Sequence, residues 1–414
     1  MEPKPQVLFV HTNYPAQFRF LVKAFIALGW EVWFASHTYK HSPLPEIRCI
    51  KMDTGIKKGS RLDQQQRTSL IAFKDLLAAK RSQGLRPLYT YVHTGWGLGQ
   101  FIKDIFPKTT MIAYSEWWFN LNAADFQFDP ENKDVKHTQN SMLQLILRNQ
   151  SFALELQQAD YIVSPTQWQK SQLPKIFRDR CNVIFDGIDT DMFSPSSVPS
   201  NLGMELDSIV AEKPLLTYAT RGLEPYRGFP EFIAAAEELL INDPDWHIAI
   251  AGADNVNYHR NPKAAKTGYG QRAKERFQNI GVDNRVHFVG SLPLRKYRDL
   301  LRRSNLHCYF TRPYVLSWSL LESALTGCKL FASSTEPVQE FLKNDQGTML
   351  VDHTSNDLGK KLLEYSTYSK TKSYDEDHKR RSDRSTLVSR VSKSECIEKH
   401  FSLIGLSKAD IVQA

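Results

Sequence analysis

Short apolar runs alternate with amphipathic stretches along this chain, and the whole alternation occurs twice. In the first half the apolar runs are residues 6–11, 31–36, 88–93, 110–115, 161–165 and 182–187. In the second half they are residues 215–220, 247–252, 285–290, 306–310 and 329–334. Buried strands of a parallel sheet appear in a sequence as short apolar runs, because helices cover both faces of the sheet. The pattern therefore predicts an α/β protein with two doubly wound, Rossmann-like sheets.

The chain has 414 residues, which is more than one hydrophobic core usually serves. We expect an N-terminal Rossmann-like domain at residues 1–190, a linker at 191–212, a second Rossmann-like domain at 213–385 and a C-terminal helical segment at 386–414. Packing of that last segment on the N-terminal domain is one arrangement open to it. The polar stretch from Tyr365 to Arg390 is predicted to be a poorly packed or mobile connection before the final helix.

Composition narrows the class of protein. Hydrophobic residues make up 41% and charged residues 24%, which is typical of a soluble globular chain. The five cysteines are scattered without CxxC spacing, which argues against a disulfide framework or a cysteine metal site. The first residues show no signal peptide, and no apolar run reaches the roughly 18 residues of a spanning helix. We expect a cytoplasmic protein.

The net charge of +8 is concentrated in one stretch, from Lys57 to Arg86, which holds eight basic residues and two acids. One interpretation is a solvated helix face. The other is a surface for anionic lipid, which would place the protein peripherally at the inner face of the membrane, or for an anionic acceptor. No zinc finger or RNA-binding motif accompanies the charge, so we expect no nucleic-acid partner.

Ligands of open parallel sheets bind outside the carboxyl ends of the strands, so the loops that follow strands are the candidate sites. The loop after the first strand includes Ala16 and Gln17 and lacks the glycines of a dinucleotide-binding turn, yet the helix start there can hold an anion. His93 ends a strand and is open to a structural or a site role. Glu116 follows another strand among aromatic residues, where it is either a surface acid or a proton-transfer group.

Two arginines follow the first strand of the second half. Arg221 and Arg227 lie on either side of a tight turn that includes Gly222 and Gly228. Guanidinium groups bind phosphate oxygens in bidentate fashion, so this pair predicts a cationic phosphate clamp. The nearby Asp189-Thr190-Asp191 resembles a metal-binding DxD motif, but it lies in the linker without a third ligand, and we expect no metal there.

The stretch from Tyr314 to Ser319 lies between a strand and a short helix. The amides of Leu316 and Ser317 would form the N-terminal end of that helix, a favourable place for phosphate. Glu322, one turn further on, could accept hydrogen bonds from two ribose hydroxyls or could simply cap the helix. In a separate loop, Gly290 would let a nucleotide base approach the backbone.

Together these motifs resemble the family 4 retaining glycosyltransferases with the GT-B fold, over nearly the whole chain. DGIDTDMFSP resembles the linker of that family, and RGLEPYRGF resembles its Arg…Lys phosphate clamp, with Arg227 where lysine is usual. HFVGSLP resembles its base-contacting loop. SLLESALTGCKLFASSTEPVQEF resembles the helix and loop that complete its nucleotide site.

The resemblance implies two Rossmann-like domains that face each other across a cleft. It implies a nucleoside-diphosphate sugar donor (a UDP-, GDP- or ADP-sugar) on the second domain and a glycan or lipid-linked acceptor on the first. Transfer would retain the anomeric configuration without a metal or other cofactor. Arg221 and Arg227 would neutralise the leaving diphosphate, with Glu116 and His93 as further catalytic candidates.

For donor binding the resemblance implies Glu322 on the ribose and Leu316 and Ser317 on the phosphate or sugar. The remaining donor-binding candidates are Ser319, Tyr314, Gly290, Ala16 and Gln17. The chain departs from the family pattern at two positions. Tyr314 stands where the family has a glutamate eight residues before the second one, and Glu116 stands near the place of a family histidine.

Two alternatives remain open from the sequence. One is an epimerase or hydrolase of sugar nucleotides with the same fold, and the other is a binding protein without catalytic activity. The sequence names neither the base, nor the sugar, nor the acceptor.

Overall fold

A computed structural model describes residues 3–40, 42–53, 59–135, 138–196, 202, 213–258, 268–370 and 384–406. The chain divides into two compact units. Unit 1 contains residues 1–123, 137–187 and 391–414, and unit 2 contains residues 124–136 and 188–390. Residues 124–136, which the sequence analysis includes in the first domain, thus group with unit 2. The domain boundaries at 190, 212 and 385 stay predictions.

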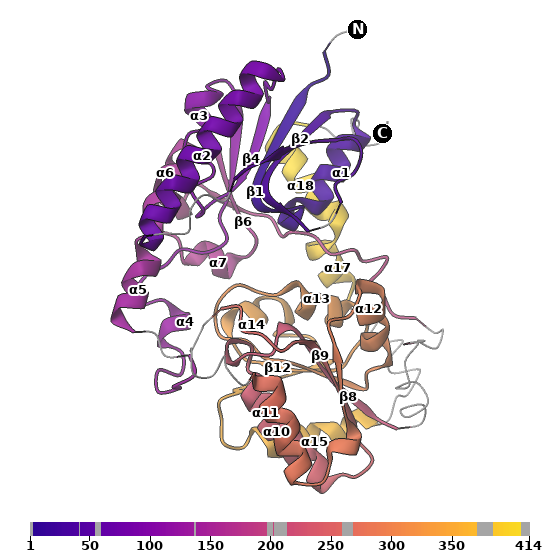
Figure 1. Cartoon of the computed structure of the whole chain (residues 1–414). Coiled ribbons are helices and arrows are strands. Elements are labelled where there is room, and N and C mark those ends of the chain that lie inside the picture. The colour runs from indigo at the N-terminus through magenta and orange to yellow at the C-terminus, as the bar shows by residue number, and fades with distance from the viewer. Residues whose placement is uncertain are drawn as a thin grey trace. The chain divides into compact units, whose positions relative to one another are not determined.

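Unit 1 is built on a seven-stranded sheet with strand order β3-β2-β1-β4-β5-β6-β7, in which every paired strand is parallel (Figure 1). Its strands are β1 (Gln6–Tyr14), β2 (Glu31–Tyr39), β3 (Ile47–Lys51), β4 (Tyr89–His93), β5 (Thr110–Tyr114), β6 (Tyr161–Ser164) and β7 (Cys181–Val183). Its helices are η1 (Ala16–Phe18), α1 (Arg19–Ala27), α2 (Arg61–Ser82), α3 (Ile102–Ile105), α5 (Gln139–Ile146), α6 (Asn149–Gln158), α7 (Gln167–Ser171), α8 (Lys175–Arg178) and α18 (Lys393–Leu403).

Helices cover both faces of this sheet, as the apolar strands require. Leu76 of α2, Ile102 of α3 and Phe152 of α6 pack on one face, in a core with Leu8 and Val10 of β1. On the other face, α1 and α18 contribute to a core that contains Phe9 of the same strand. Alternate residues of β1 therefore point to opposite cores, which is the reason that the whole run is apolar.

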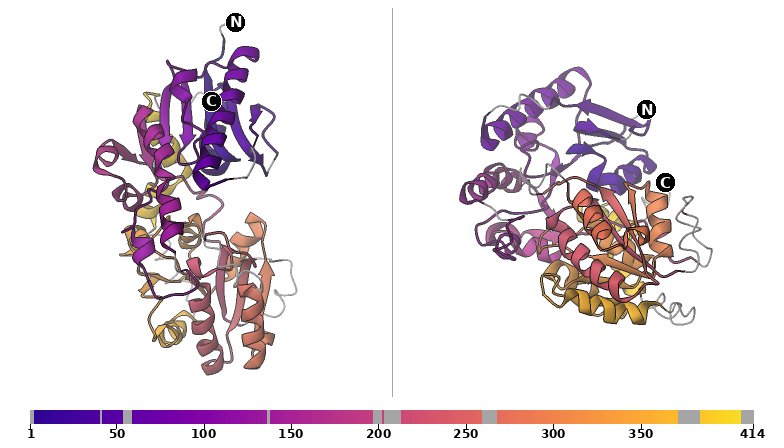
Figure 2. Two further views of the ribbon diagram at one scale, coloured as in Figure 1. Left: turned by 60° about the vertical axis from the view of Figure 1, so that its left-hand side comes forward. Right: turned by 60° about the horizontal axis from the view of Figure 1, so that its bottom comes forward.

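Unit 2 repeats the design with a six-stranded parallel sheet in the order β10-β9-β8-β11-β12-β13. Its strands are β8 (Leu215–Gly222), β9 (His247–Ala253), β10 (Val286–Gly290), β11 (Leu306–Tyr309), β12 (Leu330–Ser333) and β13 (Thr348–Val351). Its helices are α4 (Ala124–Gln127), η2 (Pro225–Arg227), α10 (Phe229–Asn242), α11 (Tyr269–Asn279), η4 (Asp283–Arg285), α12 (Leu294–Arg303), α13 (Trp318–Leu325), α14 (Glu336–Leu342), α15 (Leu358–Lys370) and α17 (Ser385–Val391). The two views of Figure 2 show the same layering within each unit.

The predicted strands are confirmed, and the predicted doubly wound topology is confirmed in both sheets. The final helix is confirmed as α18, where Ser392 caps the first turn by accepting from the amide of Glu395. The prediction of a poorly packed connection from Tyr365 to Arg390 is wrong at its start, because Tyr365–Lys370 complete α15, and residues 371–383 of that stretch lie outside the described residues. Leu362 and Ser366 of that helix are fully buried.

Residues 124–135 are held on unit 2 by polar and aromatic contacts. The Tyr226 hydroxyl donates to the Asp125 carboxylate at 2.8 Å, and the guanidinium of Arg312 donates to the Asp125 carbonyl. Phe128 stacks on the ring of His353. Burial raises the pKa of Asp125 to about 6, although the Tyr226 hydroxyl opposes the shift. The segment thus packs beside η2, the turn that carries Arg227.

Candidate active site

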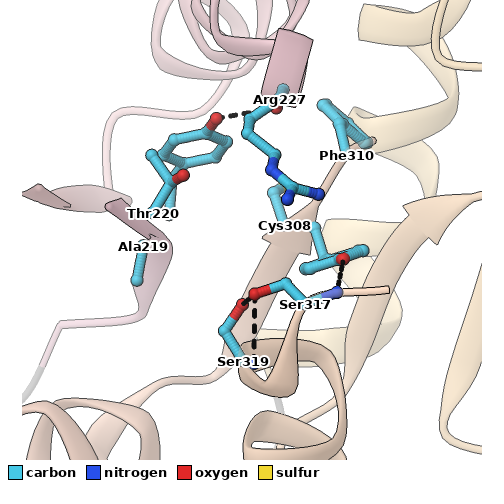
Figure 3. Close-up of a pocket in the computed structure, with 9 residues that line it drawn as sticks. Ala219, Thr220, Arg227, Cys308, Phe310, Ser317 and Ser319 are labelled. Carbon is cyan, nitrogen blue, oxygen red and sulfur yellow. Dashed lines mark hydrogen bonds between the residues drawn. The ribbon is translucent and has the colours of Figure 1, made fainter. Parts of the chain in front are cut away.

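A pocket in unit 2 lies at the carboxyl ends of β8 and β11 (Figure 3). In the strand order β10-β9-β8-β11-β12-β13 the connection reverses direction between these two strands. Such a switch point is where open parallel sheets bind ligands, because the loops diverge there. The lining residues are Tyr218, Ala219, Thr220, Arg227, Cys308, Tyr309, Phe310, Ser317 and Ser319.

The turn after β8 positions Arg227. The chain leaves β8 at Gly222, forms η2, and reaches Gly228, which has φ +64°. A Cβ at Gly228 would lie 2.5 Å from the Cβ of Phe310, so glycine meets both a backbone and a space requirement. The buried Tyr218 hydroxyl donates to the Arg227 carbonyl at 2.7 Å. This hydrogen bond from a residue of β8 therefore holds the turn in place.

The Arg227 guanidinium is buried but charged. Nη1 donates to Thr311 Oγ1 at 2.7 Å, and Nη2 donates to the Tyr258 hydroxyl at 2.9 Å. Burial opposes the charge, yet the oxygens of Tyr258 and Tyr309 and the Glu224 carboxylate keep the pKa of Arg227 above its ordinary value. Within the described ranges no carboxylate forms an ion pair with it. Figure 3 shows the side chain reaching into the pocket toward Ser317.

The start of α13 forms the opposite wall. Ser317 caps the helix, its Oγ accepting from the amide of Ser319 at 3.3 Å, and the two hydroxyls lie 2.8 Å apart. The Ser317 amide, predicted to bind phosphate, here donates to the Tyr309 hydroxyl at 3.2 Å. The structure therefore brings Arg227, Ser317 and Ser319 together and offers the serine hydroxyls as the polar groups of this wall. Leu316 is buried beside them.

The other candidates of unit 2 lie outside this lining. Arg221 is exposed near the end of β8, so the structure does not bring the two arginines together in this pocket. Gly290 is exposed, with φ +66° and open space where a Cβ would stand. Glu322 is buried one turn into α13, and Tyr314 makes an edge-to-face contact with Tyr226.

A second polar cluster lies in unit 1, at the carboxyl ends of β1, β4 and β5. The rings of His11 and His93 meet edge to face with centroids 4.4 Å apart. His93 Nε2 lies 3.7 Å from one carboxylate oxygen of Glu116, and Gln17 Nε2 donates to the other at 3.2 Å. Gln169 donates to the Glu116 carbonyl at 2.7 Å. The predicted residues His93, Glu116 and Gln17 thus share one site.

Burial keeps both histidines neutral near pH 7. It lowers the pKa of His93 to about 4, and it lowers the pKa of His11 well below its usual range, with a contribution from His93. His93 Nδ1 faces the Thr94 carbonyl, which only accepts, so the proton lies on Nδ1 and Nε2 presents a lone pair toward Glu116. This arrangement suits a site that accepts or relays a proton from a hydroxyl group.

Two further predictions concern Ala16 and the Asp189-Thr190-Asp191 motif. Ala16 begins η1 with φ +45°, in the left-handed region. In the Asp189-Thr190-Asp191 motif, the Asp189 carboxylate accepts from the amide of Met192. The described part of the chain shows no group of three or more acidic, histidine or cysteine side chains placed to hold a metal ion.

Sequence reasoning included His11 only as the start of the candidate loop after the first strand, and it missed Thr311 and Tyr258. In the structure His11 lies within β1, before the end of the strand. Thr311 directly follows the Phe310 at the end of the predicted strand 306–310. Tyr258 gives no sequence signal, because only the fold of the loop after β9 brings it to Arg227.

Two Rossmann-like units in one chain, one of them with a cationic pocket at its switch point, are features of the GT-B class of α/β protein. Sequence profiles agree: the glycosyl transferase family 4 group matches residues 29–193, and glycosyl transferases group 1 matches residues 207–379. The chain belongs to the family 4-like, group 1 glycosyltransferases, and it is a transferase. No curated protein matches it by sequence.

Solved structures share the fold at low sequence identity. HepE of Anabaena, in complex with UDP and glucose, has 15% identity and a TM-score of 0.65, over 96% of this chain and 99% of its own. Sucrose-phosphate synthase of Thermosynechococcus elongatus has 15% identity and a TM-score of 0.67, over 97% and 98%. WaaG, a glycosyltransferase of lipopolysaccharide biosynthesis, has 14% identity and a TM-score of 0.64, over 94% and 99%. Among the described helices, none is long and apolar enough to cross a membrane.

Proposed function

We propose that this chain transfers a sugar from a nucleoside-diphosphate sugar to a glycan or lipid-linked acceptor, with retention of configuration and without a metal. The observation that carries the proposal is the buried, charged Arg227 at the mouth of the β8–β11 switch point. The Glu224 carboxylate favours the charge of Arg227, but within the described residues no carboxylate forms an ion pair with it, so its remaining N–H groups can bind an anionic ligand.

Arg227 has the chemistry that departure of a nucleoside diphosphate needs. When the bond from the anomeric carbon breaks, negative charge develops on the leaving phosphate oxygen. A guanidinium that is already held by Thr311 and Tyr258 stabilises that charge without reorganisation. Other transferases use a divalent cation for this neutralisation, and the arginine supplies it here. The hydroxyls of Ser317 and Ser319 give further polar contacts to the donor.

The unit 1 cluster is the proposed place for the acceptor. Neutral His93 and the carboxylate of Glu116 can bind a sugar hydroxyl and receive its proton as that hydroxyl attacks. UDP-sugars are the first donors to test, because HepE is solved with UDP and glucose. The structure of WaaG supports a glycan acceptor by analogy of fold.

Thermal shift with UDP, GDP, ADP and their sugars tests the donor site, since a ligand of the native state raises its apparent stability. We expect one nucleotide to raise the melting temperature equally with and without EDTA. Proton NMR of the product then determines its anomeric configuration, which should be the same as that of the donor sugar. An inverted product would contradict retention, and loss of activity in EDTA would contradict the metal-free mechanism.

Contact with an anionic membrane is a further proposal, which rests on the positive charge of the stretch from Lys57 to Arg86. Lys57 and Lys58 lie outside the described residues, but Arg67, Lys74 and Arg81 are exposed along α2. Vesicles that contain 30% phosphatidylserine should sediment the protein, whereas phosphatidylcholine vesicles should not. Equal sedimentation with both would contradict the proposal.

A further inference from the structure

The start of the loop that follows β9, residues 254–258, is anchored beside the turn that carries Arg227. Gly222, the last residue of β8, lies so close to it that an added Cβ would stand 2.6 Å from the Asn255 carbonyl and 2.3 Å from Asn257 Nδ2. The buried Glu224 carboxylate accepts from the amides of Asn257 and Tyr258, at 2.7 and 3.0 Å. Both contacts fix the backbone at Tyr258 relative to the turn that carries Arg227.

These anchors place the Tyr258 hydroxyl on the guanidinium of Arg227. Nη2 donates to it at 2.9 Å, and the Tyr258 ring stacks on Tyr226 with centroids 5.1 Å apart. The residue nevertheless remains 42% exposed, unlike the buried Arg227. Tyr258 therefore connects the buried cation with solvent at the edge of the site.

The direction of this hydrogen bond leaves a donor available. A phenol hydroxyl has one proton, and a guanidinium can only donate, so the Tyr258 proton points away from Arg227. Within the described ranges the Tyr258 hydroxyl has no second hydrogen-bond partner. Donation from the guanidinium also polarises the O–H bond, which strengthens it as a donor. An O–H donor that lies beside a cation is suited to bind an oxygen atom of an anion.

We propose that Tyr258 binds the donor substrate, by donating its hydroxyl proton to an oxygen of the phosphate that Arg227 contacts. Arg227 retains three of its five N–H donors, because Thr311 and Tyr258 occupy one each. Both residues can therefore bind one phosphate at the same time. This inference rests on the proposed function of the pocket and extends it to a residue of the loop after β9.

The test is Tyr258→Phe, which keeps the ring and its stacking and removes only the hydroxyl. Isothermal titration with UDP, UMP and uridine measures affinity for the diphosphate, the monophosphate and the nucleoside. We expect UDP to bind roughly tenfold or more weakly to the variant, since a hydrogen bond to a charged group is lost. Uridine should bind both proteins equally. If UDP does not bind the wild-type chain, the same titrations are made with GDP or ADP and with the corresponding monophosphate and nucleoside.

Tyr365→Phe is the matched control, because its hydroxyl donates to the Gly347 carbonyl in another part of unit 2. It should leave all three affinities unchanged. Equal UDP affinity of Tyr258→Phe and wild type would overturn the inference, and so would an equal loss for UDP and uridine, which indicates only a packing role. Failure of every nucleoside diphosphate to bind the wild-type chain would instead refute the proposed function of the pocket.

Discussion

Replacement of Arg227 by methionine tests the central assignment with little change in volume. The side chain donates two hydrogen bonds within the protein, and three N–H groups remain for a ligand. Two of these on phosphate oxygens, at about 1.5–3 kcal/mol for each bond to a charged group, contribute about 3–6 kcal/mol to binding. At about 1.4 kcal/mol per tenfold, Arg227→Met should bind the preferred nucleoside diphosphate at least roughly 100-fold more weakly.

Titration calorimetry measures this loss, with unfolding in urea as a check that the variant keeps its fold. Arg276→Met is a suitable control, because that arginine is exposed and pairs with Glu237 on the surface of unit 2. It should bind the nucleotide as the wild type does. An affinity of Arg227→Met within threefold of a wild type that binds would refute the assignment. Arg221→Met adds a direct comparison, and a similar loss there would restore the predicted two-arginine clamp.

Three further predictions concern glutamates with different roles. Glu322→Ala should remove the preference for UDP over 2′-deoxy-UDP in titration, because Glu322 is predicted to bind the ribose; a preserved preference would contradict that role. Glu116→Gln should lower kcat at least roughly tenfold while the affinity for UDP stays within twofold, because general base catalysis typically contributes that much or more; an unchanged kcat would remove Glu116 from the mechanism. Burial raises the pKa of Glu155 from 4.5 to about 7, although the amides of Gly95 and Gly99 oppose the shift. The fold therefore favours the protonated form, so the wild type should lose about 3 kcal/mol of unfolding free energy as the pH rises from 4.5 to about 7, relative to Glu155→Gln. Urea unfolding at pH 5 and pH 8 measures this difference, and equal pH dependence of both proteins would contradict the shift.

Sequence alone determined the strands and the loops that matter. A buried parallel strand needs apolar residues on both faces, so runs such as 6–11 and 215–220 could be read directly. Parallel strands also end at a common edge, so the sequence could place His93 at a strand end and Glu116 and Arg227 in loops that follow strands. The missed strands β3 and β13 are short and lie at the edges of their sheets, where side chains are less buried and the apolar signal fades.

The tertiary structure decided which of those loops meet. Arg221 and Arg227 look equivalent in the sequence, yet only Arg227 enters the pocket, because η2 and Gly228 turn its side chain inward. Its partners Thr311 and Tyr258 come from other loops, 84 and 31 residues away in the chain. Residues 124–135 follow strands of unit 1 in sequence but pack on unit 2. Local patterns report burial and secondary structure, whereas these contacts depend on distances between segments that no local pattern encodes.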